Sequence, residues 1–349
     1  MAFMPTSLVT GAAGFVGSHV AKHLTLAGHR VIGLDDLSGG FSDNRPDGIQ
    51  FVHGSVTDHE RMAELFDDYG FDHVFHLAAY AAEGLSHFIR RFNYANNLIG
   101  SVTLVNEAVR HGVTRFVFAS SLAVYGAGQV PMTEDMTPRP EDPYGIAKYA
   151  VELDLAAAHE MFGLDYTIFR PHNVYGPGQN IADRYRNVIG IFMSQVIRGE
   201  PMTVFGDGSQ TRAFSYIDDV APIIARCVDV PDSVGRVFNV GADVPYTMLE
   251  LADVVAGCFG VQTDVKHLEA RNEVKHAYCG HDRVRAVFGD QQPVSLKAGV
   301  AAMTEWVRTM KPRPAPTFPA VEVHQRLPPA WAAAPRTADP ALDCPLLEA

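Results

Sequence analysis

The sequence predicts an α/β protein with a doubly wound parallel sheet and a second, smaller α/β domain. Two observations support this fold class. Short β-like runs alternate with longer helical patterns through the first half of the chain. A glycine-rich turn also joins the first predicted strand directly to the first predicted helix. With 349 residues, the chain has room for one large domain or two unequal ones.

The predicted elements follow in order along the chain. The first strand, residues 7–10, is apolar and stops at Gly11, and residues 16–27 then show helical periodicity. The second strand, 30–34, is rich in β-branched and apolar residues. Runs of the same character predict strands at 49–53, 73–77, 115–119 and 166–169, and helical patterns fill the gaps, for example at 59–69 and 96–111.

The sequence changes character after Arg170. Residues 171–178 read as a loop, and the later elements are shorter and more interrupted. We therefore expect a first domain over 1–173, to which 212–240 returns, and a second domain over the rest of 174–311. The remaining residues, 312–349, are rich in proline and alanine without a periodic core pattern, which predicts a tail.

Composition excludes several classes of protein. Acidic residues outnumber basic ones by 40 to 28, and no Lys/Arg cluster stands out, so neither nucleic acid nor an anionic membrane is an expected partner. No 18-residue apolar run and no signal peptide are found, which favours a cytoplasmic protein. The four cysteines are widely spaced, as free thiols in a reducing compartment are. The scattered histidines predict no metal site.

The glycine-rich turn has the pattern of a phosphate-binding loop. Gly11, Gly14 and Gly17 allow a tight turn, close approach of a pyrophosphate and packing of the helix on the sheet. Asp35 closes the next strand, 24 residues after Gly11, where a carboxylate accepts hydrogen bonds from ribose hydroxyls and repels a 2′-phosphate. These features favour NAD over NADP. The alternatives are a glycine-rich turn of an unrelated α/β protein and a solvated turn acid at Asp35.

A tyrosine and a lysine stand four residues apart at the start of a helical pattern. The spacing puts Tyr144 and Lys148 on one face of the helix. The ammonium favours the phenolate and lowers the pKa of Tyr144; a shift from about 10 to about 7 requires roughly 4 kcal/mol. Tyr144 would then act as general acid and base. It follows Ser121, at the end of a predicted strand, by 23 residues.

Several segments together resemble a known family. They are TGAAGFVG (10–17), FHLAA (75–79), NN (96–97), SSLAVYG (120–126), YGIAK (144–148), RPHNVYGP (170–177) and FGDGSQTRAFSYIDD (205–219). From about residue 7 to 310, the chain resembles the extended short-chain dehydrogenase/reductase family, and most of all its nucleotide-sugar epimerases. The resemblance implies a Rossmann-type NAD-binding domain, a smaller substrate-binding domain, a UDP-sugar substrate and a homodimer joined through the helices after Asn97 and Tyr144.

The resemblance also implies roles for individual residues. The catalytic residues would be Ser121, Tyr144 and Lys148. NAD would contact Gly11, Gly14, Phe15, Val16, Gly17, Asp35, Ser55, Val56, Leu77, Ala78, Ala79, Asn97, Ser120, Tyr144, Lys148 and Pro171. The substrate would contact Glu83, Ser86, Ser121, Asn173, Arg184, Arg186, Arg212, Arg271 and Glu273.

Some of these assignments keep an alternative open. Asn173 and Arg212 match positions that hold the diphosphate. Arg184 and Arg186 would pair with a uronate carboxylate, or else are solvated surface arginines. Glu83 and Ser86 face the sugar or have a structural role in their loop. Arg271 and Glu273 approximate a late family motif for the diphosphate and the uridine ribose.

The chain departs from the family pattern at three positions. Ser55 stands where the family often has an aspartate that reads adenine, and Ala81 where galactose enzymes often have a lysine near the nicotinamide. Ala277 stands where a bulky side chain often excludes N-acetyl groups, so it leaves room for a larger sugar substituent.

The two residues after Ser121 separate subfamilies. Related dehydratases and decarboxylases carry acidic side chains there, and 3,5-epimerases use a cysteine, whereas Leu122 and Ala123 move no proton. We therefore expect an epimerase that inverts C4 of UDP-glucose, UDP-glucuronate or UDP-N-acetylglucosamine through a 4-keto sugar. The alternatives are a 2-epimerase, a 4-keto reductase or a dehydrogenase of the same family, and a non-catalytic NAD-binding regulator.

Overall fold

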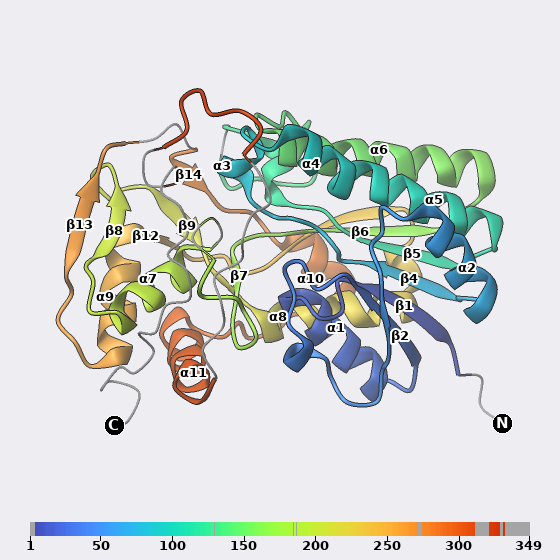
Figure 1. Cartoon of the computed structure of the whole chain (residues 1–349), viewed down its shortest axis with the longest axis horizontal. Coiled ribbons are helices and arrows are strands. Elements are labelled where there is room, and N and C mark those ends of the chain that lie inside the picture. Colours follow the sequence, from blue (N-terminus) through green and yellow to red (C-terminus); the bar gives the residue numbers. More distant parts are fainter. Residues whose placement is uncertain are drawn as a thin grey trace.

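The computed structural model describes residues 4–128, 130–183, 185, 187–270, 274–310, 321–328 and 331. Its centre is a seven-stranded sheet whose neighbouring strands all run parallel, which confirms the predicted fold class (Figure 1). Across the sheet, the strands are β11 (Arg236–Val240), β6 (Tyr166–Pro171), β5 (Arg115–Ala119), β4 (His73–His76), β1 (Thr6–Thr10), β2 (Arg30–Asp35) and β3 (Gln50–His53).

The strand order places a ligand crevice. Strands β2 and β3 lie on one side of β1, and β4, β5 and β6 lie on the other. The order therefore reverses between β1 and β4, and ligands of open parallel sheets bind outside the carboxyl ends of the strands at such a switch point. The chain turns at Gly11 after β1 and at Leu77 after β4. The seventh strand, β11, for which no strand is predicted, extends the sheet beyond β6.

Helices cover both faces of this sheet. On one face lie α2 (His59–Tyr69), α5 (Gly100–Arg110) and α6 (Pro143–Phe162), and on the other α1 (Phe15–Leu26) and α8 (Ile217–Arg226) (Figure 1). Successive side chains of a strand point to opposite faces, so Leu8 packs with the first group of helices and Val9 with the second. Both residues are fully buried, as the interior of a doubly wound fold requires.

Local signals set the ends of the helices. The Asp58 carboxylate accepts a hydrogen bond from the Arg61 amide at the start of α2, and Gly70 ends this helix in the left-handed region. The Asp142 carboxylate caps α6 through the Gly145 amide, with Pro143 in the first turn. These caps fix where α6, which carries Tyr144, begins.

The chain after β6 builds a smaller set of elements at one end of the sheet (Figure 1). Its strands form three small sheets: β7 (Val174–Tyr175) with β10 (Ser215–Tyr216), β9 (Thr211–Ala213) between β12 (Pro245–Thr247) and β14 (His276–Ala277), and β8 (Met202–Phe205) with β13 (Val265–Leu268). Its helices are α7 (Val188–Ile197), α9 (Met248–Phe259) and α11 (Leu296–Thr309), whereas α10 (Asp282–Phe288) packs against β11 of the central sheet.

Short helical turns complete the described chain. They are α3 (Glu83–Ser86), α4 (Arg90–Tyr94), the π-helical turn η2 (Ala95–Ile99) and the 3₁₀ turns η1 (Ser42–Asn44), η3 (Leu122–Tyr125), η4 (Cys227–Asp229) and η5 (Pro231–Ser233). The helix predicted over 96–111 is thus a π-helical turn followed by α5. Within the described ranges, no helix has both the length and the apolar character needed to cross a bilayer.

Candidate active site

The glycine turn after β1 is built for close approach of a ligand to the backbone. Gly11 has φ +72°, and a Cβ atom there would lie 2.9 Å from the Ala78 nitrogen. A Cβ on Gly17 would lie 2.0 Å from the Gly11 oxygen, so only glycine lets α1 begin this close to the turn. The N-cap of α1 is Gly14, which has no side chain to cap the first amides. These amides and the helix dipole suit a pyrophosphate.

Asp35 is fixed at the end of β2 by backbone amides. Its Oδ2 accepts from the Ala13 nitrogen at 3.0 Å and its Oδ1 from the Leu37 nitrogen at 2.8 Å. Burial raises the pKa of this carboxyl, and the hydrogen bonds from the amides counteract that shift. Asp35 is therefore fixed beside the glycine turn, where it is predicted to accept from ribose hydroxyls.

A cavity of about 370 Å³ opens at the switch point. It is lined by fifteen of the sixteen predicted NAD contacts: Gly11, Gly14, Phe15, Val16, Gly17, Asp35, Ser55, Val56, Leu77, Ala78, Ala79, Ser120, Tyr144, Lys148 and Pro171. Its lining includes the glycine turn, the start of α1 and Asp35. These features fit the pyrophosphate and ribose of NAD, so the residues present match the predicted cofactor.

Asn97, the remaining predicted contact, lies behind the cavity wall. Its Oδ1 accepts from the Tyr80 nitrogen at 2.9 Å and its Nδ2 donates to the Tyr80 oxygen at 3.1 Å. Nδ2 also donates to Asn93, whose own Nδ2 donates to the Pro143 oxygen. Asn97 and Asn93 thus tie the loop after β4 to the first turn of α6, which carries Tyr144. Asn97 lies in the π-helical turn, a feature often found at functional sites.

A buried chain of hydrogen bonds connects η2 and α5 to the ends of β4 and β1, directly before the glycine turn. The Ser101 hydroxyl donates to the Asn97 oxygen and therefore accepts from His76 Nε2. His76 Nδ1 then accepts from Thr10, whose Oγ1 in turn accepts from the Leu77 and Ala78 amides. His76 is neutral in this arrangement, and burial lowers its pKa to about 3.

The catalytic candidates meet where α6 begins. A Cβ on Gly145 would lie 2.6 Å from the Ala123 oxygen, so this glycine allows α6 to pack against η3 and brings Tyr144 beside Ser121. Both residues line the cavity together with Lys148. The Lys148 Nζ donates to the Ala119 oxygen at 2.7 Å and lies 5.8 Å from the centre of the Tyr144 ring. Burial lowers the pKa of Lys148 to about 7.

The predicted substrate contacts divide into three groups. Glu83, Ser121 and Asn173 line the cavity. Ser86 and Arg212 do not line the cavity. Ser86 is buried and donates to the Glu83 oxygen. The Arg212 guanidinium donates to the backbone oxygens of Thr211, Val274 and Lys275. Arg184, Arg186, Arg271 and Glu273 lie outside the described residues.

Several further residues line the cavity without having been predicted. Polar examples are Gln179, Asn180 and Asn187, and aromatic examples are Tyr80 and Phe92. Asn187 is the N-cap of α7, where its side chain accepts from the Ile189 amide. An asparagine directly before an apolar helical run was the available sequence signal for it. Tyr80 and Phe92 carry no comparable signal, because a lining aromatic and a core aromatic look alike in sequence.

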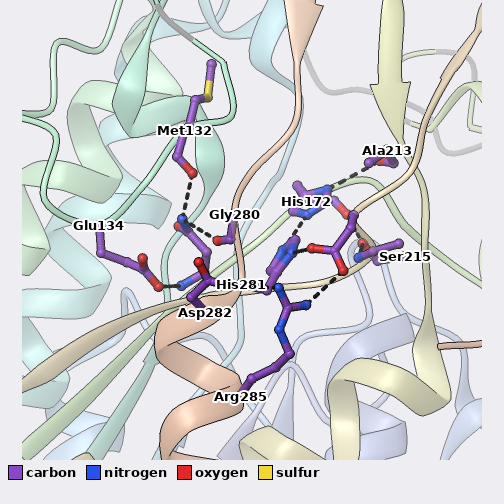
Figure 2. A network of polar contacts seen from close by, with 12 residues as sticks. Met132, Glu134, His172, Ala213, Ser215, Gly280, His281, Asp282 and Arg285 are labelled. Atoms are coloured by element: carbon purple, nitrogen blue, oxygen red, sulfur yellow. Dashed lines mark hydrogen bonds and ion pairs between the residues drawn. The ribbon is translucent and has the colours of Figure 1, made fainter. Parts of the chain in front are cut away.

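A network of two histidines connects the loop before Asn173 to the smaller elements (Figure 2). His172 Nδ1 faces the Ala213 carbonyl at 3.3 Å and therefore donates to it, which leaves Nε2 to accept from His281 Nε2 at 3.0 Å. His281 Nδ1 lies 2.7 Å from the Asp243 carboxylate, which Arg285 also binds. These bonds from His281 and Arg285 lower the pKa of Asp243 to about 2.

Acidification is expected to unfold the protein through its buried histidines. Burial lowers the pKa of His172, as of His76, to about 3, with His281 adding to the shift at His172. The unfolded chain binds protons on these groups near pH 6.5 and the folded chain does not, so stability falls as pH falls from 6.5 toward 3. Each of the two histidines should lower the free energy of unfolding at pH 5 by about 2 kcal/mol relative to pH 7. Urea unfolding at pH 7 and pH 5 measures this loss.

Two variants test the assignment of this acid sensitivity. His172→Asn should reduce the difference in unfolding free energy between pH 7 and pH 5 by about 2 kcal/mol. His59→Gln, at the exposed start of α2, is the control and should leave the difference unchanged. Equal unfolding free energies of the wild type at the two pH values would refute the prediction.

The fold and the site together define a class of protein. The sheet is parallel, and its switch point opens on the glycine turn, with Tyr144 and Lys148 beside it. This is the architecture of a dinucleotide-dependent enzyme. Comparison with known proteins narrows the class: the model of the NAD dependent epimerase/dehydratase family matches residues 7–241. The chain belongs to this family, as its resemblance to the nucleotide-sugar epimerases predicts.

Individual relatives agree with this assignment. The chain is 34% identical over 310 residues to a UDP-glucose 4-epimerase of Mycolicibacterium smegmatis, a match that covers 86% of this chain and 98% of that protein. Among solved structures, it is similar to the UDP-glucose 4-epimerase of Thermotoga maritima with UDP-glucose (TM-score 0.83, 32% identity, 87% of this chain and 98% of that one). The UDP-glucose 4-epimerase of Thermus thermophilus in complex with NAD is comparably similar (TM-score 0.81, 30% identity, 87% and 99%).

Proposed function

We propose that this protein is an NAD-dependent 4-epimerase of a UDP-sugar. The observation that carries the proposal is the composition of the catalytic wall. Ser121 and Tyr144 line the cavity beside Lys148, whereas the next two residues of the chain, Leu122 and Ala123, are apolar and begin η3. Directly after Ser121 the chain therefore offers no carboxyl or thiol for the additional proton transfer of a dehydratase, and Tyr144 is the acid/base group beside it. The relatives named above are UDP-glucose 4-epimerases.

The proposed chemistry follows from these side chains. Tyr144, as phenolate, takes the proton of the sugar 4-hydroxyl, and the Lys148 ammonium stabilises the phenolate. The Ser121 hydroxyl donates a hydrogen bond to the reacting oxygen. When bound, NAD would supply the acceptor and later the donor of the hydride of C4. Tyr144 would hold the proton of the 4-hydroxyl while the 4-keto sugar turns about its diphosphate link, and would then return it to the same oxygen.

The substrate side of the cleft offers a place for the diphosphate. Asn173 lines the cavity at the end of β6, with φ +41°, and its Nδ2 is bound to the Ala213 oxygen at 3.0 Å. The strained backbone and this bond fix the side chain of Asn173 where the β6 strand opens onto the cleft. We propose that Asn173 binds the diphosphate, and that Arg212 of strand β9 reaches it only when its guanidinium leaves the Val274 and Lys275 oxygens.

Chromatography tests the proposal. The purified protein is incubated separately with UDP-glucose, UDP-glucuronate and UDP-N-acetylglucosamine, without added NAD. We expect one of them to yield its 4-epimer, with no net change in absorbance at the reduced-nicotinamide band, because NAD is regenerated in each cycle. Conversion that requires added NAD(H) and changes this absorbance would instead identify a dehydrogenase or a 4-keto reductase.

The surface of α6 supports a homodimer. Large apolar side chains are exposed on it and on the adjoining turn η2: Ile146 (41%), Leu153 (55%), Met161 (74%), Phe162 (67%) and Ile99 (57%). Because α5 packs beside α6, the two helices present one face to solvent. We propose that this face joins two copies of the chain.

Leu153→Glu should therefore convert a dimer into a monomer. A charge at the centre of an apolar contact must lose its hydration in the dimer without gaining a partner. Light scattering coupled to size exclusion measures the mass. The control is Leu26→Glu, which places the same charge on another exposed leucine (74%) at the end of α1, on the opposite face of the sheet. A wild-type protein that elutes as a monomer would contradict the proposed interface.

A further inference from the structure

The C-terminal part of the chain returns to the active site. Residues 321–328 lie against the region of α3 and α4, where Figure 1 draws them in red. The amides of Glu322 and Val323 both donate to the Phe88 oxygen, at 2.8 Å and 3.1 Å. The Glu322 carboxylate accepts from the amides of Arg91 and Phe92, at 2.8 Å and 2.9 Å. Since Ile89, the N-cap of α4, provides no side-chain cap, Glu322 caps this helix from outside.

Trp331 fixes the same region by apolar contact. Its ring covers Gly84 so closely that a Cβ there would lie 3.0 Å from the indole. It meets the rings of Phe88 and Tyr185 edge to face, with centres 6.1 Å and 5.5 Å apart. The indole belongs to an apolar cluster around Ala82, Leu85 and Ile89, which also includes Tyr80 and Phe92.

The helices held in this way face the substrate. Glu83 of α3, Phe92 of α4 and Tyr80 before them line the cavity on the side of Ser121 and Tyr144. Both helices also contact α6. The Ser86 hydroxyl, which donates to the Glu83 oxygen, lies 3.4 Å from Oδ1 of Asp142, the N-cap of α6, and Asn93 donates to the Pro143 oxygen. Only α3, α4 and their side chains therefore separate the C-terminal segment from the cavity and from the first turn of α6, which carries Tyr144.

We propose that residues 321–328 and Trp331 form a strap that positions Tyr80, Glu83 and Phe92 and thereby sets which sugar the cleft accepts. The inference rests on the proposed function, because the wall faces a sugar only if the substrate is a sugar nucleotide. The strap lies beyond residues 7–241, the part matched by the family model. The proposed determinant of sugar specificity therefore lies outside the part of the chain that matches the family model. Glu322 and Trp331 act as positioning residues, and neither lines the cavity.

Hydrogen exchange tests whether the strap holds the wall. Glu322→Ala and Trp331→Ala are compared with Gln325→Ala, a control on the same segment, all in the full-length protein. Loss of the external cap should speed exchange of the amides of residues 83–94 by about 5- to 30-fold, and the control should match the wild type. Exchange at the wild-type rate in both Glu322→Ala and Trp331→Ala would overturn the proposal.

Kinetics test whether the strap positions the sugar. In Trp331→Ala, KM for the sugar nucleotide should rise about tenfold while kcat stays within about twofold, because ground-state contacts with the sugar are lost and the acid/base residue is retained. The ratio of KM values between two accepted sugars should also change, and the content of bound NAD should not. An unchanged KM for every accepted sugar would overturn the role in positioning, even if the helices exchange faster.

Calorimetry separates this proposal from the proposed reaction. UDP, UDP-glucose and UDP-glucuronate are titrated into the wild type and into Trp331→Ala. A wild type that binds a UDP-sugar without converting it rejects the 4-epimerase. Weaker binding of that UDP-sugar by Trp331→Ala, with equal binding of UDP, still supports the strap. Equal affinities of the two proteins for all three ligands overturn the strap.

Discussion

Replacing Tyr144 with phenylalanine is expected to lower turnover by about 10²- to 10⁴-fold, the range that general acid–base groups contribute. The ring still fills its place at the start of α6, where it is 5% exposed, so the fold should be preserved. The variant loses the phenol that we propose exchanges a proton with the sugar hydroxyl. Lys148 keeps its hydrogen bond to the Ala119 oxygen, and the glycine turn is untouched. Bound NAD should therefore be retained.

The measurement combines turnover with the NAD released on denaturation. Tyr149→Phe is the matched control, since it removes a phenol from the same helix at a residue that does not line the cavity. The control should turn over at nearly the wild-type rate. Near-normal turnover of Tyr144→Phe would show that another group moves the proton and would remove the basis of the proposed mechanism.

Replacing Arg170 with methionine is expected to destabilise the fold by about 3–5 kcal/mol. Arg170 and Glu152 form an ion pair behind the catalytic wall, and both residues are at most 5% exposed. Arg170 Nε donates to Glu152 Oε1 at 2.9 Å, and the Ser120 hydroxyl donates to the same carboxylate. The Arg170 guanidinium also lies 4.7 Å from the centre of the Tyr125 ring. Without Arg170, the buried carboxylate loses its ion-pair partner and keeps the hydrogen bond from the Ser120 hydroxyl, with the charge of Lys148 nearby.

Urea unfolding at pH 7 measures this loss. The control is Arg198→Met, which breaks the surface pair with Glu200, whose two side chains are 30% and 44% exposed. It should cost less than about 1 kcal/mol. The double variant Arg170→Met/Glu152→Leu should recover part of the stability, because it removes the unpaired charge. A single variant as stable as the wild type would mean that water or another cation reaches Glu152.

The predictable part of the site depends on short-range patterns. The glycines of the turn and the Tyr144–Lys148 pair combine chemical identity with a spacing that a helix or a turn converts directly into geometry. The carboxyl ends of parallel strands then bring these segments to one edge of the sheet. This explains why all the predicted NAD contacts but Asn97 line one cavity. The NAD contact of Asn97 stays a prediction, and the structure adds its hydrogen bonds to Tyr80.

The unpredicted part depends on partners distant in sequence. Glu152 and Arg170 come from α6 and β6, and neither segment alone indicates that the two side chains pair. Arg212 lies on strand β9, and its bonds to the Val274 and Lys275 oxygens arise only when β14 pairs beside that strand. Strand β11, which has no predicted counterpart, is defined by its parallel pairing with β6, a strand more than 60 residues earlier in the chain.

The order of strands also governs how the sheet grows during synthesis. Strands β1, β2 and β3 appear first, and the later strands of this sheet add to the other side of β1, in the order β4, β5, β6 and β11. Until Arg236–Val240 has left the ribosome, β6 therefore forms a bare edge, although most of its side chains are buried in the finished protein. Such an edge pairs readily with other chains. A ribosome that stalls before residue 236 would thus release an aggregation-prone fragment that already carries the complete glycine turn and Tyr144.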